Sequence, residues 1–308
     1  MPRYLVVGAG TIGSLVAQRL VEDGDSVTLV SRRGHKPAHP DIKAIAADAA
    51  NAPEMMRIAQ GTDTIINCAN PAYHRWPVDW PPIASSLLDA ARGTGSSLVT
   101  LSNLYSYGKQ DGPMSPESPL NARYEKALVR AQMWEEALGA HRAGLVRTTE
   151  VRASDFIGPH SQGVFAERVI PRILESKSCR LIGDLDQLHS WTYVVDVAST
   201  LVTCARSNEA WGKVWHVPTN PPRTQRQVVN DLAETAGTDH IRISTIPLSA
   251  LRLMGLFNPI IRELPKTLYQ FTGSFIIDDS ATRNQFGLAP TPWASVLRET
   301  IDSYRSSR

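Results

Sequence analysis

Three glycines near the start of the chain have the spacing of a phosphate-binding loop. Gly8, Gly10 and Gly13 form a G-x-G-x-x-G pattern that follows an apolar run and opens a helical pattern. In that context the first glycine permits a tight turn, the second lets the backbone approach a pyrophosphate, and the third lets the helix pack closely on the strand. The positive end of the helix, which begins with Thr11 and Ile12, then faces the phosphates. The pattern predicts a dinucleotide-binding loop.

The end of the next predicted strand indicates which dinucleotide this loop would bind. A site for NAD(H) usually has a carboxylate there, which bonds the ribose 2′-hydroxyl. This chain has Ser31, Arg32 and Arg33 instead. Guanidinium groups suit a 2′-phosphate because they are planar, bidentate donors with a permanent charge. We therefore expect NADP(H) rather than NAD(H), with a solvated basic turn as the alternative. Asp48, after the third strand, either accepts from the adenine amino group or caps a turn.

A loop rich in aromatic residues and prolines, at 71–82, follows the fourth predicted strand. Open α/β sheets bind their ligands at the carboxyl edge, where this loop begins. Its aromatic, His and Arg side chains predict a pocket for an oxygen-bearing small molecule, completed by aromatic residues of a smaller lobe. A proline-stiffened packing loop is the alternative. The candidate substrate-binding residues are Tyr73, His74, Trp76, Tyr105, Phe156 and Trp191.

The elements that must position these residues alternate between strand and helix patterns. Strands are predicted at 4–7, 26–30, 43–46, 64–67, 97–101 and 146–152, and helices at 11–22, 53–59, 83–92 and 121–140. This alternation is typical of βαβ units and a parallel sheet. We expect an α/β fold, a Rossmann-type doubly wound parallel sheet with a smaller C-terminal substrate lobe. The nucleotide-binding domain would span 1–158, and 159–308 would form mainly the lobe, with later segments returning to the sheet. In this second part, 164–174, 194–204 and 225–236 have helical periodicity, and 214–217 is strand-like.

Composition excludes several classes of partner. The chain has 308 residues, is 42% hydrophobic and carries a formal net charge of +2. This balance predicts no nucleic-acid or anionic-membrane partner, and no apolar run approaches the roughly 20 residues of a membrane helix. Cys68, Cys179 and Cys204 form no framework of pairs, which favours a reducing, cytoplasmic location. The eight histidines show no metal-ligand spacing, so we expect no metal.

Four further segments carry a resemblance to a known family. They are Asn67-Cys68-Ala69, the run LSNLYSYG at 101–108, RASDFIGP at 152–159 and WTYVVDVA at 191–198. Together with the glycine pattern they resemble the extended or atypical short-chain dehydrogenase/reductases of the NAD-dependent epimerase/dehydratase type, over nearly the whole chain. The resemblance implies that Cys68 and Ala69 line the cofactor, and that a homodimer is possible.

The chain departs from this family at its catalytic residues. The family uses a Ser or Thr that bonds the substrate oxygen, then a Tyr and, four residues later on one helix, a Lys that lowers the Tyr pKa. Asn103 stands at the Ser/Thr position, and its amide still donates to a carbonyl oxygen. The helix at 121–140 has no Tyr-x-x-x-Lys pair, because Tyr124 is followed at this spacing by Leu128. The face of this helix that carries Tyr124 is mainly apolar, so one interpretation is that Tyr124 faces the core.

Lys126 and Arg130 are the polar pair of that helix with the correct spacing. Aligned with the family, Lys126 takes the tyrosine position and Arg130 the lysine position, where it would hold the nicotinamide ribose. Lys126 would donate a proton only if burial and Arg130 lowered its pKa. A solvated basic face is the alternative. Tyr105, on the loop after the fifth strand, is the other candidate acid, whereas Tyr107 corresponds to a structural position of the family.

Three functions fit these residues. The first is an NADP(H)-dependent oxidoreductase or epimerase-like enzyme that acts on a small-to-medium organic carbonyl or alcohol. In it Asn103 polarises the oxygen, and Lys126, Tyr105 or ordered water moves the proton. The second is a dinucleotide-binding sensor or regulatory protein without catalysis, and the third is a non-redox isomerase or cyclase on the same fold. The missing catalytic pair favours the last two, whereas the aromatic loop favours an enzyme.

Overall fold

The computed structural model describes residues 1–35, 37–161, 163, 165–238 and 240–306. Its centre is a seven-stranded sheet in the order β11-β6-β5-β4-β1-β2-β3, in which every neighbouring pair is parallel. This confirms the predicted Rossmann-type α/β fold. The strands are β1 (Arg3–Val7), β2 (Ser26–Ser31), β3 (Lys43–Ala46), β4 (Thr64–Asn67), β5 (Ser97–Asn103), β6 (Thr148–Ala153) and β11 (Val214–His216).

The strand order reverses beside β1. The chain builds β2 and β3 on one side of β1, then crosses to its other side for β4, β5 and β6. A crevice forms at the carboxyl ends of the strands where the order reverses, because the connections of the two halves lead to opposite faces. The glycine loop follows β1 and the 67–69 turn follows β4, so both lie at this crevice.

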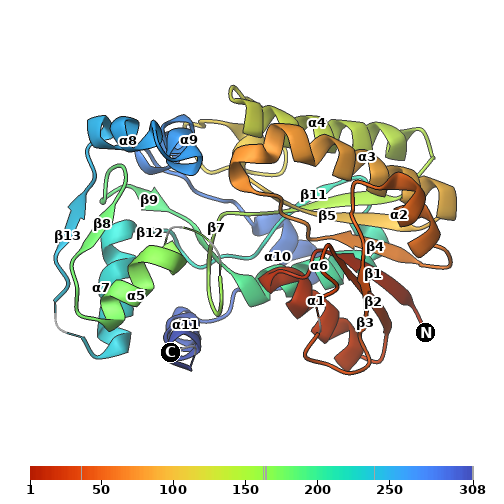
Figure 1. The fold of residues 1–308 in the computed structure, drawn as a ribbon, viewed down its shortest axis with the longest axis horizontal. Coiled ribbons are helices and arrows are strands. Elements are labelled where there is room, and N and C mark those ends of the chain that lie inside the picture. The colour runs from red at the N-terminus through yellow and green to blue at the C-terminus, as the bar shows by residue number, and fades with distance from the viewer. Residues whose placement is uncertain (36, 162, 164, 239, 307–308) are drawn as a thin grey trace.

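Helices cover both faces of the sheet (Figure 1). α2 (Ala52–Ile58), α3 (Trp76–Thr94) and α4 (Glu125–Arg142) pack in sequence on one face, and α1 (Thr11–Glu22) packs against α6 (Val194–Arg206) on the other. Successive side chains of β1 point to opposite faces. Leu5 and Val7 accordingly join the core under α2 and α3, whereas Val6 joins the core under α1 and α6.

The second half of the chain forms a lobe beside the sheet and also contributes to the sheet layers. Its helices are α5 (Ile170–Leu174), α7 (Gln225–Ala236), α8 (Leu248–Gly255), α9 (Pro259–Thr267), α10 (Ser280–Phe286) and α11 (Trp293–Ser306). Its short strand pairs are β7 (Asp155–Ile157) with β10 (Trp191–Tyr193), β9 (Leu188–His189) with β12 (Arg223–Thr224), and β8 (Cys179–Leu181) with β13 (Ile243–Thr245).

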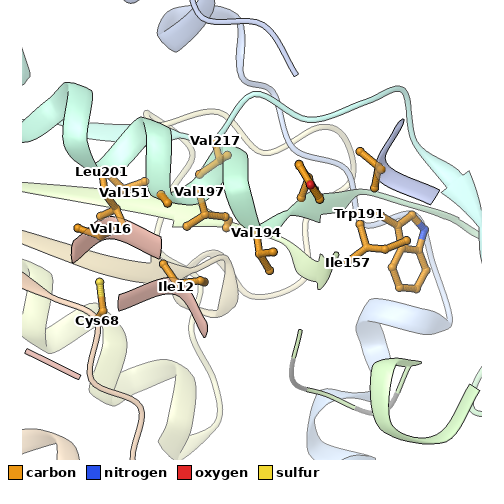
Figure 2. Close-up of a cluster of buried hydrophobic side chains, with 14 of the residues drawn as sticks. Ile12, Val16, Cys68, Val151, Ile157, Trp191, Val194, Val197, Leu201 and Val217 are labelled. Atoms are coloured by element: carbon orange, nitrogen blue, oxygen red, sulfur yellow. The ribbon is translucent and has the colours of Figure 1, made fainter. Parts of the chain in front are cut away.

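One hydrophobic core connects the sheet to the lobe. Figure 2 shows Ile12 and Val16 of α1 beside Val197 and Leu201 of α6, and the same cluster continues to Trp191 of β10. α6 and β11 return to the sheet from the second half of the chain, as the sequence pattern predicted. Because the core is continuous, the lobe is held in a defined position against the carboxyl edge of the sheet.

The start of α3 differs from the sequence prediction. The aromatic stretch expected as a loop up to residue 82 is helical from Trp76 onward, with Pro81 and Pro82 inside the helix. Two prolines remove helix hydrogen bonds, which argues against a helix from sequence alone. Trp80 and Leu87 are fully buried on one face, and this burial outweighs the lost bonds.

Two further sequence expectations are corrected by the fold. α4 begins at Glu125 rather than near residue 121, because Tyr124 has an extended backbone and caps the helix. The predicted helix at 164–174 is a π-helical turn, Phe165–Val169, followed by α5; residue 164 lies outside the described residues. Among the described helices, none has the length and apolarity to cross a membrane.

Candidate functional site

The glycine loop has the geometry that a pyrophosphate requires. Gly8 has a φ of +106°, and a Cβ there would lie 2.5 Å from the carbonyl oxygen of Cys68. A Cβ on Gly13 would lie 1.8 Å from the carbonyl oxygen of Gly8, so only glycine lets α1 approach the strand this closely. A Cβ on Gly10 would meet no atom within 4 Å, which leaves open space over the start of α1. A phosphate fits this space, because no side chain in the described chain caps the helix.

Two backbone segments enclose the glycine loop. The turn after β4 packs on it, and there the Asn67 side chain accepts a bond of 3.1 Å from the Ala69 backbone N–H. Burial raises the pKa of the Cys68 thiol to about 12, so Cys68 packs rather than reacts. From the lobe side, the Thr11 hydroxyl donates to the His160 carbonyl oxygen at 2.6 Å. Ile12 is buried in the core below.

The predicted 2′-phosphate site lies at the end of β2. Arg32 and Arg33 are both exposed there, and the Ser31 hydroxyl oxygen accepts a bond of 2.9 Å from the His35 backbone N–H. Asp48 accepts from the Ala50 backbone N–H at 3.0 Å, so its side chain closes a turn. The end of β2 therefore presents two guanidinium groups and no carboxylate of its own.

A small cavity opens near the carboxyl end of β5. We call it the tyrosine cavity. It lies where the segment after β5, the start of α4 and the α9 region meet, and it is lined by Tyr105, Tyr124, Glu125, Lys126, Ala127, Glu263, Lys266, Thr267 and Tyr269. Of the sequence-predicted site residues, the fold places Tyr105 and Lys126 in this lining.

Tyr105 stands between the end of β5 and the tyrosine cavity. Asn103, the last residue of β5, accepts a bond of 3.1 Å from the Tyr105 backbone N–H through its side-chain oxygen. The amide NH₂ of Asn103 remains as the donor for a ligand. The Tyr105 hydroxyl lies 3.4 Å from the Tyr73 hydroxyl, and Tyr73 in turn donates to Thr267 at 3.4 Å. Since Tyr73 donates its proton to Thr267, the Tyr105 hydroxyl is the donor in its contact with Tyr73, and at 3.4 Å this bond is weak.

Burial raises the pKa of the Tyr105 phenol well above its ordinary value, and the charge of Asp155 and the neighbouring Tyr73 add to this shift. Asp155, the first residue of β7, lies 2.9 Å from His189 Nε2 through its Oδ2. This pair was not predicted, because its two residues lie on separate strands of the lobe. The raised pKa keeps Tyr105 protonated at neutral pH.

Lys126 lies in the tyrosine cavity wall, but its ammonium group is already paired. It is only 4% exposed and forms a buried ion pair with Glu263 of α9, over the face of Tyr73. Burial alone would raise the pKa of Glu263, but Lys126 and Lys266 outweigh it and lower that pKa. Glu263 lies 137 residues from Lys126 in the chain, so no sequence pattern indicated this partner.

Arg130 lies deeper, below β5. Its Nη2 donates to the Leu101 carbonyl oxygen at 3.0 Å, and its guanidinium carbon lies 4.4 Å from the Trp80 ring centroid. Burial lowers its pKa to about 10. The solvated basic face that was the alternative for Lys126 and Arg130 is therefore wrong, and so is the core-facing Tyr124, which is 44% exposed.

The remaining predicted substrate residues do not line the tyrosine cavity. His74 is exposed, Phe156 is half-buried against the core, and Trp76 and Trp191 are buried. Trp76 donates through its indole N–H to the Pro71 carbonyl oxygen and packs with Trp80, which fits the packing alternative for the aromatic stretch. Most of the cavity residues that sequence reasoning missed come from α9 and the segment after it: Glu263, Lys266, Thr267 and Tyr269.

A second polar cluster lies close by and is sealed. We call it the buried arginine network: Glu150, Arg152, Tyr107, His216 and the Asp278 carbonyl. Arg152 donates to Glu150 at 2.6 Å and lies over the Tyr107 ring, and the Tyr107 hydroxyl lies 2.7 Å from His216 Nε2. His216 Nδ1 must donate to the Asp278 carbonyl oxygen at 2.8 Å, so its Nε2 accepts from Tyr107. Tyr107 is structural, as the resemblance implied.

Comparison with known proteins defines the class. The sequence model of the NAD dependent epimerase/dehydratase family matches residues 4–217. The chain therefore belongs to this family. No curated protein matches the chain in sequence.

Solved structures share the whole fold at low sequence identity. UDP-glucose 4-epimerase of Thermotoga maritima, with UDP-glucose, has a TM-score of 0.83 and 18% identity, covering 99% of both chains. dTDP-glucose 4,6-dehydratase of Streptomyces venezuelae, with NAD bound, has a TM-score of 0.81 and 20% identity, covering 99% of this chain and 98% of that one. UDP-glucuronic acid 4-epimerase of Bacillus cereus, with UDP-glucuronic acid and NAD, has a TM-score of 0.81 and 17% identity, covering 99% and 100%.

Proposed function

We propose that this protein is an NADP(H)-dependent oxidoreductase or epimerase-like enzyme that acts on a small-to-medium organic carbonyl or alcohol, with Tyr105 as its acid. The observation that carries the proposal is the position of Tyr105. It follows β5 at the same edge of the sheet as the glycine loop, beside Asn103 and open to a cavity. The carboxyl ends of adjacent parallel strands meet at one edge, so a ligand there reaches both.

The chain supplies binding and a proton. When bound, the dinucleotide supplies a hydride to the carbonyl carbon. The Asn103 amide donates a hydrogen bond to the carbonyl oxygen, and the Tyr105 hydroxyl gives that oxygen a proton. The phenolate that remains takes the Tyr73 proton, Tyr73 takes the Thr267 proton, and Thr267 regains a proton from solvent, so both hydroxyls must turn to donate toward Tyr105. Lys126 is paired with Glu263, so it holds the cavity wall and Tyr73 in place.

NADP(H) is the proposed cofactor because β2 ends in Arg32 and Arg33 and not in a carboxylate. Two of the solved structures named above contain NAD, which is the cofactor of those two proteins. In the proposed site Arg32 and Arg33 pair with the 2′-phosphate, and the glycine loop holds the pyrophosphate. Arg130 as a ligand of the nicotinamide ribose stays a prediction, since in the structure its guanidinium group contacts the Leu101 carbonyl oxygen and the rings of Trp76 and Trp80.

The experiment that tests this function has two parts. Fluorescence titration with NADPH and NADH should show tighter binding of NADPH, and the Arg32→Ala, Arg33→Ala double variant should lose most of that preference. A panel of aldehydes and ketones should then include one that the protein reduces with NADPH. If the double variant keeps the full preference, the 2′-phosphate site is wrong.

A dinucleotide-binding sensor without turnover is the second candidate. It is favoured by the engagement of Lys126 with Glu263 and of Arg130 with the Leu101 carbonyl, because neither residue is free to lower the pKa of a tyrosine. Tight NADPH binding without oxidation by any member of the carbonyl panel would select this reading over the enzyme.

A further inference from the structure

The helical hairpin formed by α8 and α9 holds an unusual concentration of exposed apolar side chains. In the described chain twelve large apolar side chains are exposed, and six of them lie within residues 248–260. Phe257 is 87% exposed, Leu256 74% and Leu253 63%. Single exposed apolar residues are normal on a protein surface, but a contiguous group of this kind marks an interaction site.

The hairpin is well formed, so its apolar tip is not an unfolded segment. The Asn258 side chain accepts from the backbone N–H groups of Ile260 and Ile261 at 2.9 and 3.2 Å and caps α9. A Cβ on Gly255 would lie 2.9 Å from the Arg262 Cα, so the two helices approach closely. Leu251 and Ile261 face inward and pack with Ile182 of the lobe. Leu256 and Phe257 occupy the turn between the helices and have no such contact.

The charge around this tip has one sign. Arg252 and Arg262 are exposed on the two helices, and the sequence from 248 to 262 has no Asp or Glu. Within the part of the chain that the structure describes, neither arginine forms an ion pair. Two copies joined through this tip would bring four unpaired guanidinium groups together, which is unfavourable. An anionic surface offers complementary charge instead.

The hairpin lies at one end of the molecule. In Figure 1, α8 and α9 lie at the upper left, at the end of the lobe away from β1 to β3 and the glycine loop that follows β1. The near-zero net charge of the whole chain predicts no membrane partner, but that balance averages over the molecule, whereas binding depends on the local surface.

We propose that the α8–α9 hairpin is an interfacial anchor that binds the surface of an anionic lipid bilayer. Leu253, Leu256 and Phe257 enter the boundary between headgroups and acyl chains, and Arg252 and Arg262 contact the anionic headgroups. A hairpin with apolar residues at its tip and basic residues beside them has the character of a segment that lies in this boundary. The inference is independent of the proposed enzymatic function.

Vesicle co-sedimentation of the full-length protein tests the anchor. The wild type should bind vesicles of phosphatidylcholine mixed with phosphatidylglycerol at least about tenfold more tightly than vesicles of phosphatidylcholine alone. The Leu256→Ser, Phe257→Ser double variant should lose at least about tenfold of this binding, because the buried apolar area is gone. The Arg252→Glu, Arg262→Glu double variant should lose the preference for anionic vesicles.

The matched control is the Val78→Ser, Leu145→Ser double variant, which changes two residues that are 64% and 51% exposed outside the hairpin. It should bind vesicles as the wild type does, and circular dichroism should show that all variants fold. The proposal is overturned if the wild type binds neither vesicle, binds both equally, or if the control loses as much binding as the hairpin variant. Light scattering that shows a dimer, converted to a monomer by Leu256→Ser with Phe257→Ser in the absence of vesicle binding, overturns it in favour of a second copy as the occupant.

Discussion

Tyr105 and Tyr107 lie in one turn after β5, and the structure gives them opposite environments. Tyr105 borders the tyrosine cavity, and its hydroxyl lies in one long contact of 3.4 Å with the Tyr73 hydroxyl. Tyr107 is fully buried, and its hydroxyl donates to a histidine that has one defined tautomer. Tyr105 lines the tyrosine cavity and is half-buried, whereas the side chains of Glu150, Arg152, Tyr107 and His216 in the buried arginine network are each at most 2% exposed. The Tyr107 proton holds two strands and a turn together, and in the proposed function the Tyr105 proton is the one that a ligand takes.

The comparison also shows that tyrosine can line a cavity in one place and stabilise the fold in another. Charged groups in both regions are paired, since Lys126 pairs with Glu263 and Arg152 with Glu150. Unpaired charges would be costly at this depth. The difference lies in what the phenol faces: open space in the first case and a saturated acceptor in the second.

The largest expected effect is on turnover by the Tyr105→Phe variant. Removal of the hydroxyl should lower kcat for carbonyl reduction by about a hundredfold or more, because a positioned acid contributes this much. NADPH affinity and thermal stability should stay near those of the wild type. Steady-state kinetics with the best substrate of the carbonyl panel measure the effect. A Tyr105→Phe variant with the wild-type kcat would mean that the comparison assigns the acid to the wrong tyrosine.

The next effect is on stability, from breaking the ion pair of the tyrosine cavity. Lys126→Met leaves the buried Glu263 carboxylate with Lys266 alone, at 3.2 Å, and should lower the free energy of unfolding by about 3 kcal/mol. The Lys126→Met, Glu263→Met double variant should recover part of this loss, because no buried charge remains unpaired. Urea unfolding measures both. Equal stability of wild type, single and double variants would show that the pair does not hold the cavity wall.

A smaller effect is expected at Tyr107, where the partner of His216 is removed. Tyr107→Phe leaves the buried Nε2 of His216 without a donor, which should cost about 1–3 kcal/mol of stability. In contrast to Tyr105→Phe, kcat should change little. Measurement of Tm and kcat for both variants tests the contrast between the two tyrosines most directly. The assignment of the acid to Tyr105 is wrong if Tyr107→Phe is the variant that stops turnover.

The last expected effect is a pH dependence that arises in the buried arginine network. Burial lowers the pKa of His216 from its ordinary value of 6.5 to about 3. Below pH 6.5 the unfolded chain takes up this proton while the folded chain does not, so stability falls as the pH falls toward 3, by at most about 1.4 kcal/mol per pH unit. Above pH 6.5 the group has no effect. A His216→Gln variant should show a shallower decline in urea unfolding between about pH 7 and about pH 5; an unchanged slope would assign the dependence to other groups.

Local patterns allowed much of the fold to be predicted. The glycine loop, the six strands of the first half and α6, α7 and β11 lie close to the predicted positions. These elements depend on residue spacing within a short window, such as the 8, 10 and 13 positions of the glycines. The start of α3 was predicted wrongly because the local signal, two prolines, was outweighed by burial of Trp80 against elements distant in the chain.

The candidate site was predictable only in part. Sequence spacing singled out Asn103, Tyr105, Lys126 and Arg130, yet it left open whether the last two were solvated. Tyr73 and Thr267, whose hydroxyls meet at 3.4 Å, are 194 residues apart. No periodicity connects positions so distant, because their contact follows from how α9 packs against the turn Tyr73–Arg75, which precedes α3.

The sequence by itself determined the class of fold, the family and the glycine loop, since each depends on the spacing of residue types within short segments of the chain. Only the tertiary structure decided which tyrosine opens to a cavity, which lysine is paired, and that the apolar tip of α8 and α9 is exposed. The physical reason is burial: pKa, hydrogen-bond availability and apolar exposure depend on what surrounds a side chain, and those surroundings come from every part of the folded chain.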